Sequence, residues 1–162
     1  MTQSQALSKS AQNVQEFLSQ KGLNFKVVEL AESTRTADDA ARAIGCEVAQ
    51  ICKSLIFKTK NTHKPVLVLA SGINRVNEKI IETQVGEKII KADADFTRDI
   101  TGFVIGGIPP FAHKKSIDFI LIDEDLLQFD EIWAAAGNPN AVFSLKGSDL
   151  KEITKGQIIS IK

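Results

Sequence analysis

The sequence predicts an α+β fold: a single domain built around a mixed, curved β-sheet or small β-barrel, with short helices around it. Three observations favour this class. The 162 residues are enough for one complete hydrophobic core, and they include no linker, internal repeat or low-complexity tract. Short apolar segments separated by polar turns are typical of antiparallel hairpins. Helical segments occur between them irregularly, unlike the strand–helix alternation of a parallel doubly wound sheet.

The composition is that of an ordinary folded protein. Apolar residues make up 43% of the chain and charged residues 25%, so the whole chain should fold. Twenty basic residues balance twenty acidic ones, which gives no argument from overall charge for nucleic acid binding. No apolar run approaches the ~20 residues that a membrane helix needs, and Met1 to Gln5 lack the pattern of a secretion signal. We therefore expect a cytoplasmic protein that binds neither membranes nor DNA.

The first elements are a helix and a strand. Val14, Phe17 and Leu18 have the i, i+3, i+4 spacing of an apolar helix face, and a glycine follows where a C-cap is expected. These signals predict a helix over residues 8–21. The composition of residues 25–30 is typical of a strand, and a polar loop follows it.

A second helix should begin at Thr36. Asp39 lies three positions later, in a capping-box-like arrangement, and Gly45 follows the last helical residue. The face of this helix carries alanines, which indicates that it packs closely against its neighbours.

The most unusual segment is the strand expected over residues 51–59, because Lys53 lies inside an otherwise apolar run. Successive strand side chains point to opposite faces, so Lys53 and Cys52 should lie on opposite sides. The Lys53 face also carries Ile51, Leu55 and Phe57, and the Cys52 face carries Ser54 and Ile56. An unpartnered ammonium is costly to bury, so Lys53 either lines a polar cavity or meets an anion, or it extends to water along its aliphatic stem. Cys52 is expected to be a small core residue.

The middle of the chain should continue with a hairpin, two helices and a short strand. Residues 65–70 are a second apolar run across a polar turn, which predicts an antiparallel hairpin. Asn77 can cap a helix that runs to about Val85 and ends at a glycine. A short strand is expected over residues 88–91 and a short helix over residues 93–100.

Residues 101–111 form the second notable segment, which contains Gly-Gly-Ile-Pro-Pro at residues 106–110. Adjacent glycines permit close backbone approach and positive φ, whereas the prolines restrict φ and exclude a helix before them. We expect a stiff loop with open backbone N–H groups. Such a loop can bind an oxyanion or a phosphate, or it can be a plain structural turn, because it matches neither glycine-rich nucleotide-binding motif.

The C-terminal part should complete the sheet. Residues 131–136 suit either a strand or a short helix, and the turn-forming residues 137–140 favour a hairpin with residues 141–145. The remaining expected elements are a strand over residues 117–122, a helical turn over residues 149–153 and a closing strand over residues 158–161.

Most common catalytic arrangements are absent from the sequence. It has no GxSxG or HExxH motif, and its two histidines, His63 and His113, lie in charged loops. The two cysteines form no metal-ligand pattern. Consecutive residues Asp123–Asp125 cannot all bind one ion from a strand, and we expect them to form a solvated turn. Lys53 and the loop at residues 106–110 remain as the chemical candidates.

Four segments carry a resemblance to a known family. They are the helix start at residues 36–45, the lysine strand at residues 50–55, the Ser71-Gly72 end of the next strand, and the Thr-Gly-Phe to Pro-Pro segment at residues 101–110. From about Leu23 to Ile161, their order and spacing resemble the YbaK/prolyl-tRNA-synthetase-associated editing domain. Residues 1–162 are therefore interpreted as one YbaK-like domain.

This resemblance implies hydrolysis of the ester that joins a wrongly attached amino acid to the terminal ribose of a tRNA. It implies Lys53 as the catalytic residue and a substrate site that includes Thr36, Ser54, Gly106, Gly107, Ile108, Pro109 and Pro110. The chain length resembles that of trans-acting members, so we expect the aminoacylated 3′ end of a tRNA as a partner, and a synthetase as a second one. No metal or organic cofactor is implied. Ser54 stands where some members have Asn, which leaves the amino-acid specificity open.

The residues are compatible with this chemistry. A held water, with N–H and cationic groups aimed at developing negative charge, can hydrolyse an activated ester. Lys53 should then face the loop at residues 106–110 across one pocket. Two alternatives remain open: a catalytically silent tRNA- or synthetase-binding module of the same fold, and a small-molecule esterase that uses the same pocket.

Overall fold

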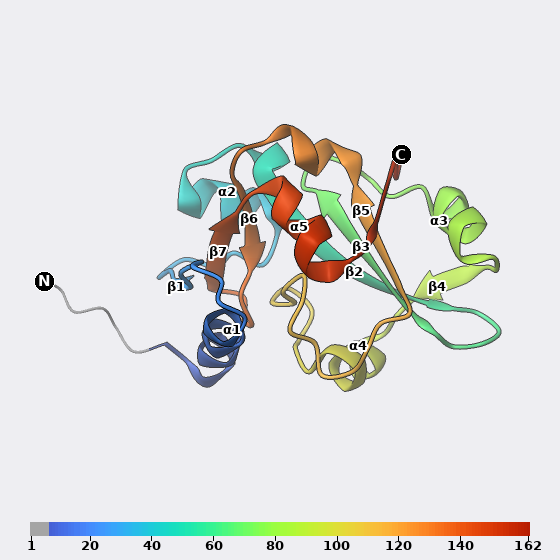
Figure 1. Cartoon of the computed structure of the whole chain (residues 1–162), viewed down its shortest axis with the longest axis horizontal. Helices are drawn as coiled ribbons and strands as arrows, with labels where there is room; N and C mark the ends of the chain where they lie inside the picture. Colours follow the sequence, from blue (N-terminus) through green and yellow to red (C-terminus); the bar gives the residue numbers. More distant parts are fainter. Residues whose placement is uncertain (1–6) are drawn as a thin grey trace, which may run out of the picture.

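The computed structural model describes residues 7–162, and Figure 1 shows them arranged around one β-sheet. The expectation that Met1 to Gln5 carry no secretion signal falls outside these residues. Within the described chain, eight strands form a mixed sheet in the order β1-β7-β6-β2-β3-β5-β8, with β4 added beside β2. The predicted α+β class with a mixed sheet is confirmed.

The strands are β1 (Val28–Glu29), β2 (Ile51–Thr59), β3 (Pro65–Ser71), β4 (Ile89–Lys91), β5 (Phe119–Asp123), β6 (Ile132–Ala135), β7 (Ala141–Leu145) and β8 (Gln157–Ile159). The helices are α1 (Lys9–Gln20), α2 (Ala37–Ile44), α3 (Glu78–Val85), α4 (Ala94–Thr101) and α5 (Gly147–Thr154), with 3₁₀ turns at Val48–Gln50 and Glu124–Gln128. No helix among residues 7–162 has the length and apolar content needed to cross a membrane.

Local signals define the ends of α2, α3 and α4. At the start of α2, the Thr36 Oγ1 accepts a hydrogen bond from the Asp39 N–H at 3.1 Å. Gly45 follows α2 with a φ of +88°, which glycine adopts readily. The side chains of Asn77 and Asp93 cap α3 and α4 in the same way as Thr36. These three helices begin and end where the sequence predicts.

Strand β2 has different partners along its two edges. On one edge it forms the predicted antiparallel hairpin with β3, from Cys52 to Lys58. On the other edge, β6 pairs with residues 51–52 and β4 pairs with residues 57–59. Residues 53–56 therefore have no strand partner on that edge, and the sheet divides there.

Apolar layers cover both faces of the sheet. One layer packs α1, α5 and the loop after α4 against the face that carries Cys52 and Ile56. The other packs α3 against the face that carries Phe57, and α2 covers Ile51 near the end of β2. Strand β3 is buried on both faces because it separates these layers. The predicted alternation along β2, the core position of Cys52 and the β6–β7 hairpin are confirmed.

The strand expected over residues 25–30 is shorter than predicted. Only Val28 and Glu29 pair with β7. The Gln15 side chain on α1 accepts a hydrogen bond from the Val27 N–H at 2.8 Å and donates one to the Phe25 carbonyl at 3.2 Å. These bonds tie the segment to the helix in place of a β-ladder.

The prediction of a solvated turn at Asp123–Asp125 is wrong. Asp123 is the last residue of β5 and is only 1% exposed. A 3₁₀ turn follows it at Glu124–Gln128. The Asp123 carboxylate accepts hydrogen bonds from groups about 50 positions earlier in the chain, such as the Ser71 N–H, and no local pattern announces these partners.

Candidate active site

Two pockets lie where the sheet divides. Their volumes are about 390 Å³ for the first and about 730 Å³ for the second. They share five lining residues, which are Lys53, Ser54, Leu55, Ile105 and Ile108. We call this shared lining the junction. It joins the unpaired edge of β2 to the loop after α4, so elements about 50 residues apart in the sequence form one site.

Lys53 is half-buried at the junction, and its ammonium has a protein partner. The Lys53 Nζ donates to the main-chain carbonyl of Asn74 at 2.9 Å. This contact uses one of three ammonium N–H donors, and the other two have no partner among residues 7–162. Burial lowers the pKa of Lys53, and the negative charge of Asp123 opposes that effect. Of the two interpretations left open by the sequence, this geometry favours a lysine that lines a cavity.

Ser54 presents main-chain groups to the same place. On the β2 edge away from β3, the Ile56 carbonyl accepts from the Ala92 N–H at 3.2 Å. Strand residues two apart turn the same way, so the Ser54 N–H and carbonyl also point to this edge, where no strand pairs with them. The Ser54 Oγ is buried and has no hydrogen-bond partner among the described residues.

Two of the five residues of the Gly-Gly-Ile-Pro-Pro loop, Gly106 and Ile108, line the first pocket with Lys53. Gly106 has a φ of +96°, and a Cβ at this position would lie 2.9 Å from the Arg35 Cγ. The backbone conformation therefore favours glycine, and the absence of a side chain also leaves room for Arg35, which lines the same pocket.

The other three loop residues lie behind this lining. The Gly107 N–H donates to the Val104 carbonyl at 3.0 Å, and the Gly107 carbonyl accepts from the β6–β7 turn at 2.9 Å. Pro109 and Pro110 are buried, and the Pro109 carbonyl contacts the His113 Nε2 at 2.7 Å. The expectation of an open N–H at Gly107 is wrong, because that donor is used within the loop.

Thr36 and Ser54 also line the first pocket. The structure therefore brings together Thr36, Lys53, Ser54, Gly106 and Ile108 from the residues that the sequence singled out. Their roles toward a substrate remain predictions.

The two pockets differ in chemistry. Small or apolar side chains of α2 and the sheet wall the first pocket, among them Ala37, Ala40, Ile44, Ile51 and Ala134. The second pocket has cationic groups at Arg75 and Lys91 in addition to Lys53, and one carboxylate at Glu78. The first pocket also carries Arg35 and Lys53, so it is mostly apolar but not free of charge, and the second pocket is larger and more polar.

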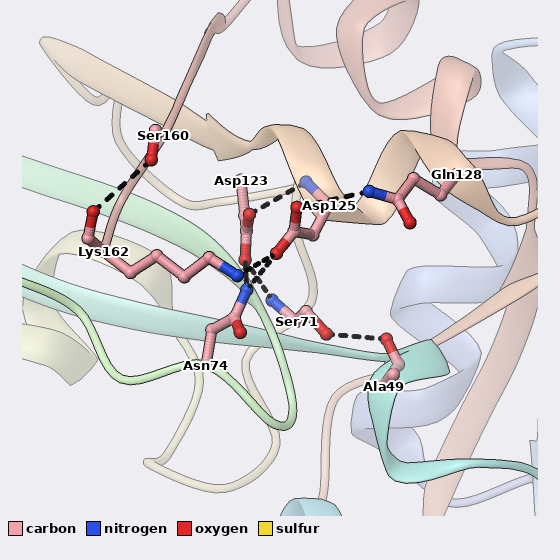
Figure 2. A network of polar contacts seen from close by, with 8 residues as sticks. All are labelled: Ala49, Ser71, Asn74, Asp123, Asp125, Gln128, Ser160 and Lys162. Atoms are coloured by element: carbon pink, nitrogen blue, oxygen red, sulfur yellow. Dashed lines mark hydrogen bonds and ion pairs between the residues drawn. The ribbon is translucent and has the colours of Figure 1, made fainter.

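The sequence interpretation missed Asn74 and the part played by Asp123. Figure 2 shows that the Asn74 side chain donates to the carboxylates of both Asp123 and Asp125, and that the Ser71 N–H donates to Asp123. The Lys162 Nζ lies 2.8 Å from the Asp125 Oδ2. Asn74 also lines the second pocket. The one available signal was an acidic residue directly after an apolar strand.

The described residues offer few groups for metal or thiol chemistry. Among residues 7–162, no cluster of three or more His, Cys, Asp or Glu side chains is placed to hold a metal ion. Burial raises the pKa of the Cys52 thiol to about 12, so Cys52 is protonated near neutral pH.

Comparison with known proteins identifies the family. Residues 31–153 match the model of the aminoacyl-tRNA editing domain. The chain belongs to this family. The resemblance to the YbaK/prolyl-tRNA-synthetase-associated domain is thereby confirmed, and so, at the level of the family, is the prediction of an aminoacyl-tRNA deacylase.

Individual editing-domain relatives match over nearly their whole length. A solved structure, described as that of a candidate trans-editing enzyme for prolyl-tRNA synthetase, is 42% identical with a TM-score of 0.90, covering 97% of this chain and 99% of the other. The multifunctional Ser/Thr-tRNA deacylase ProXp-y of Escherichia coli K12 is 26% identical, over 100% of this chain and 98% of its own. EbsC of Enterococcus faecalis, a candidate Cys-tRNA(Pro)/Cys-tRNA(Cys) deacylase, is 26% identical over 92% of each chain.

Proposed function

We propose that this protein is a trans-acting deacylase that hydrolyses the ester between a small amino acid and the terminal ribose of a tRNA. The observation that supports it most is that Lys53 lines both a smaller, mostly apolar pocket and a larger pocket with two further cationic side chains. An aminoacyl-tRNA 3′ end has the same division, because a small amino acid is joined there to an anionic nucleotide.

The proposed orientation follows from this division. The amino acid occupies the first pocket against Ala37 and Ala40, and the terminal nucleotide occupies the second near Arg75 and Lys91. The ester carbonyl then lies at the junction beside Lys53. Thr36, Gly106 and Ile108 bind the substrate from the first pocket, and Gly107, Pro109 and Pro110 hold the loop in place behind them.

Hydrolysis needs an attacking water and groups that stabilise the negative charge it creates. The water oxygen adds to the ester carbonyl carbon, and the carbonyl oxygen becomes an oxyanion. The Lys53 ammonium and the outward-facing Ser54 N–H act as donors to this oxyanion. Collapse breaks the bond to the ribose oxygen, which gains the proton that the water loses. The products are a free amino acid and a tRNA with a free terminal hydroxyl.

Pocket size sets the amino-acid preference. One methylene group discriminates by only about 1–3 kcal/mol, so the pocket acts mainly by excluding larger side chains. The names of the relatives refer to Ser, Thr and Cys, which are all small. We propose substrates of this size class, with tRNA as the partner and a prolyl-tRNA synthetase as a second partner, as in the description of the 42% identical relative. The proposal needs no cofactor, and a cytoplasmic location remains a prediction.

A panel of tRNAs mischarged with small amino acids tests the proposal. The wild-type protein should release at least one of these amino acids. Lys53→Ala should lower kcat by about 10²- to 10³-fold, the usual cost of removing one oxyanion donor. The matched control is Lys60→Ala, because Lys60 is exposed just beyond the same strand and should not affect the rate.

Other outcomes would contradict specific parts of the proposal. Full activity in Lys53→Ala would exclude Lys53 from the site. Binding of tRNA without hydrolysis would identify a catalytically silent module. Equal rates on simple amino-acid esters and on aminoacyl-tRNA would identify a small-molecule esterase.

A further inference from the structure

Asp123 is a buried carboxylate with a full set of neutral donors. The Ser71 N–H and the Asn74 Nδ2 donate to its Oδ2 at 2.9 and 2.8 Å, and the Asp125 N–H donates to its Oδ1 at 2.9 Å. Burying a charge is costly even with such partners, and apolar side chains of similar volume often give equal or greater stability. The groups that Asp123 binds therefore indicate a role beyond packing.

Asp123 is connected to Lys53 through one residue, Asn74. The Asn74 side chain donates to the carboxylates of Asp123 and Asp125, each at 2.8 Å (Figure 2). The main-chain carbonyl of the same residue accepts from the Lys53 Nζ at 2.9 Å. The Asn74 side chain is thus bound by the carboxylates of Asp123 and Asp125, and its main-chain carbonyl binds the Lys53 ammonium.

Asp123 also fixes the turn that carries the Asn74 carbonyl. The Asn74 N–H donates to the Ser71 carbonyl at 2.9 Å, and the Ser71 Oγ donates to the Ala49 carbonyl at 2.7 Å. The Asp123 carboxylate receives the remaining buried donors of this turn. Without it, the Ser71 N–H would have no acceptor and the turn would rearrange, because a buried donor without a partner lowers stability.

We propose that Asp123 is a positioning residue for Lys53: through Asn74 it places the ammonium at the junction and compensates its charge from a distance. This inference rests on the proposed function of Lys53. Among residues 7–162, the Lys53 ammonium forms no ion pair. Its positive charge and its two remaining donors therefore stay available to a substrate, whereas a direct carboxylate partner would neutralise that charge.

Removing the Asp123 charge should change the titration of Lys53. Burial lowers the pKa of Lys53 most, while Asp123 at the end of β5 raises it, Arg75 after β3 lowers it and Asp38 on α2 raises it. Asp123→Asn should therefore lower the Lys53 pKa further, and the alkaline limb of the pH–rate profile should move to lower pH.

The experiment measures kcat, KM and the pH–rate profile for deacylation by the full chain. Asp123→Asn should lower kcat about 10- to 100-fold with a much smaller change in KM, because the donor to the oxyanion is misplaced. In a Lys53→Ala background the same substitution should have no further effect on kcat. The matched control is Glu124→Gln, which removes an exposed carboxylate from the adjacent position and should leave kcat and the pH profile unchanged.

A second variant keeps the test valid if Asp123→Asn does not fold, as judged by circular dichroism and thermal melting. Asn74→Ala leaves the hydrogen bonds from the Ser71 and Asp125 N–H groups to Asp123 intact and removes the side-chain bonds from Asn74 to Asp123 and Asp125. It should reproduce the fall in kcat and its dependence on Lys53. A folded Asp123→Asn or Asn74→Ala protein with wild-type kcat would overturn the proposal, as would an equal fall in the Lys53→Ala background.

A direct readout separates this inference from the proposed function. The pKa of Lys53 can be followed by NMR of ¹³C-labelled lysine, with Lys53→Ala for assignment. A lower Lys53 pKa in Asp123→Asn but not in Glu124→Gln supports the positioning role even if no tested aminoacyl-tRNA is hydrolysed. An unchanged pKa overturns it even if the wild-type protein is an active deacylase.

Discussion

At the scale of single residues, the site places an ammonium with one hydrogen-bond partner beside a hydroxyl that has none among the described residues. The Lys53 ammonium has the Asn74 carbonyl as its partner, whereas the adjacent Ser54 Oγ is buried without one among the described residues. A buried hydroxyl without a hydrogen bond lowers stability. We infer that the buried Ser54 hydroxyl lowers stability at a position beside the proposed substrate site.

Ser54→Ala should therefore stabilise the protein in the absence of substrate. The expected gain in the free energy of unfolding is up to about 1 kcal/mol, because an unpaired buried polar group is removed. The measurement is urea denaturation of both proteins. Ser71→Ala is the matched control: its Oγ donates to the Ala49 carbonyl at 2.7 Å, so this variant should lose about 1 kcal/mol. Equal destabilisation by the two substitutions would contradict the prediction.

At the scale of elements, the site depends on strand β2 and on the loop after α4. Each of them is held in position by other parts of the fold. Strand β2 pairs with β6 and β4 at its ends and stays open in the middle. The loop after α4 reaches this opening because Gly107 packs against the β6–β7 turn, where a Cβ would lie 2.6–2.8 Å from the Asn138 backbone. No side chain fits at Gly107 unless one of the two segments moves.

Gly107→Ala should displace the loop from the junction. We expect a loss of about 1–3 kcal/mol in the free energy of unfolding, as for other overpacked sites, together with a higher KM for aminoacyl-tRNA. Denaturation and steady-state deacylation measure the two effects. Gly22→Ala is the control, because its surroundings are open and only its φ of +73° causes strain. It should cost about 1 kcal/mol and leave KM unchanged, and a Gly107→Ala protein with the same behaviour would exclude the packing argument.

At the scale of the whole molecule, a contact within the loop after α4 links the stability of the protein to pH. The His113 Nε2 contacts the Pro109 carbonyl at 2.7 Å, and because a carbonyl only accepts, Nε2 carries the proton. Burial lowers the pKa of His113, and the bond to Pro109 opposes this effect. The folded protein therefore binds the second imidazole proton less readily than the unfolded chain does.

This difference predicts how stability depends on pH. The contribution of neutral His113 is complete above pH ~6.5 and is lost as the pH falls below that value toward the lower pKa of the folded state. Urea denaturation at pH 7.5 and at mildly acidic pH should show a larger loss for the wild type than for His113→Gln, which can keep a donor but does not titrate. An identical loss in both proteins would show that His113 is not responsible.

Much of the fold was predictable because its signals are local. The caps at Thr36, Asn77 and Asp93, the β2–β3 hairpin and the alternation along β2 depend on residues within a few positions of one another. The strand expected over residues 25–30 is shorter than predicted for a tertiary reason. The Gln15 side chain binds the main-chain groups of Phe25 and Val27 that a β-ladder would use.

The sequence by itself determined most of the element types, the two faces of β2, and Lys53 with the Gly-Gly-Ile-Pro-Pro segment as the candidate site. Only the tertiary structure decided that β6 and β4 leave residues 53–56 of β2 without a strand partner on one edge. It also decided that the Gly107 N–H and carbonyl are used within the protein, and that Asp123 is buried. The physical reason is distance along the chain. Helix caps and strand alternation are set by neighbours, whereas the contact between Asn74 and Asp123 joins residues 49 positions apart and exists only once the sheet has formed.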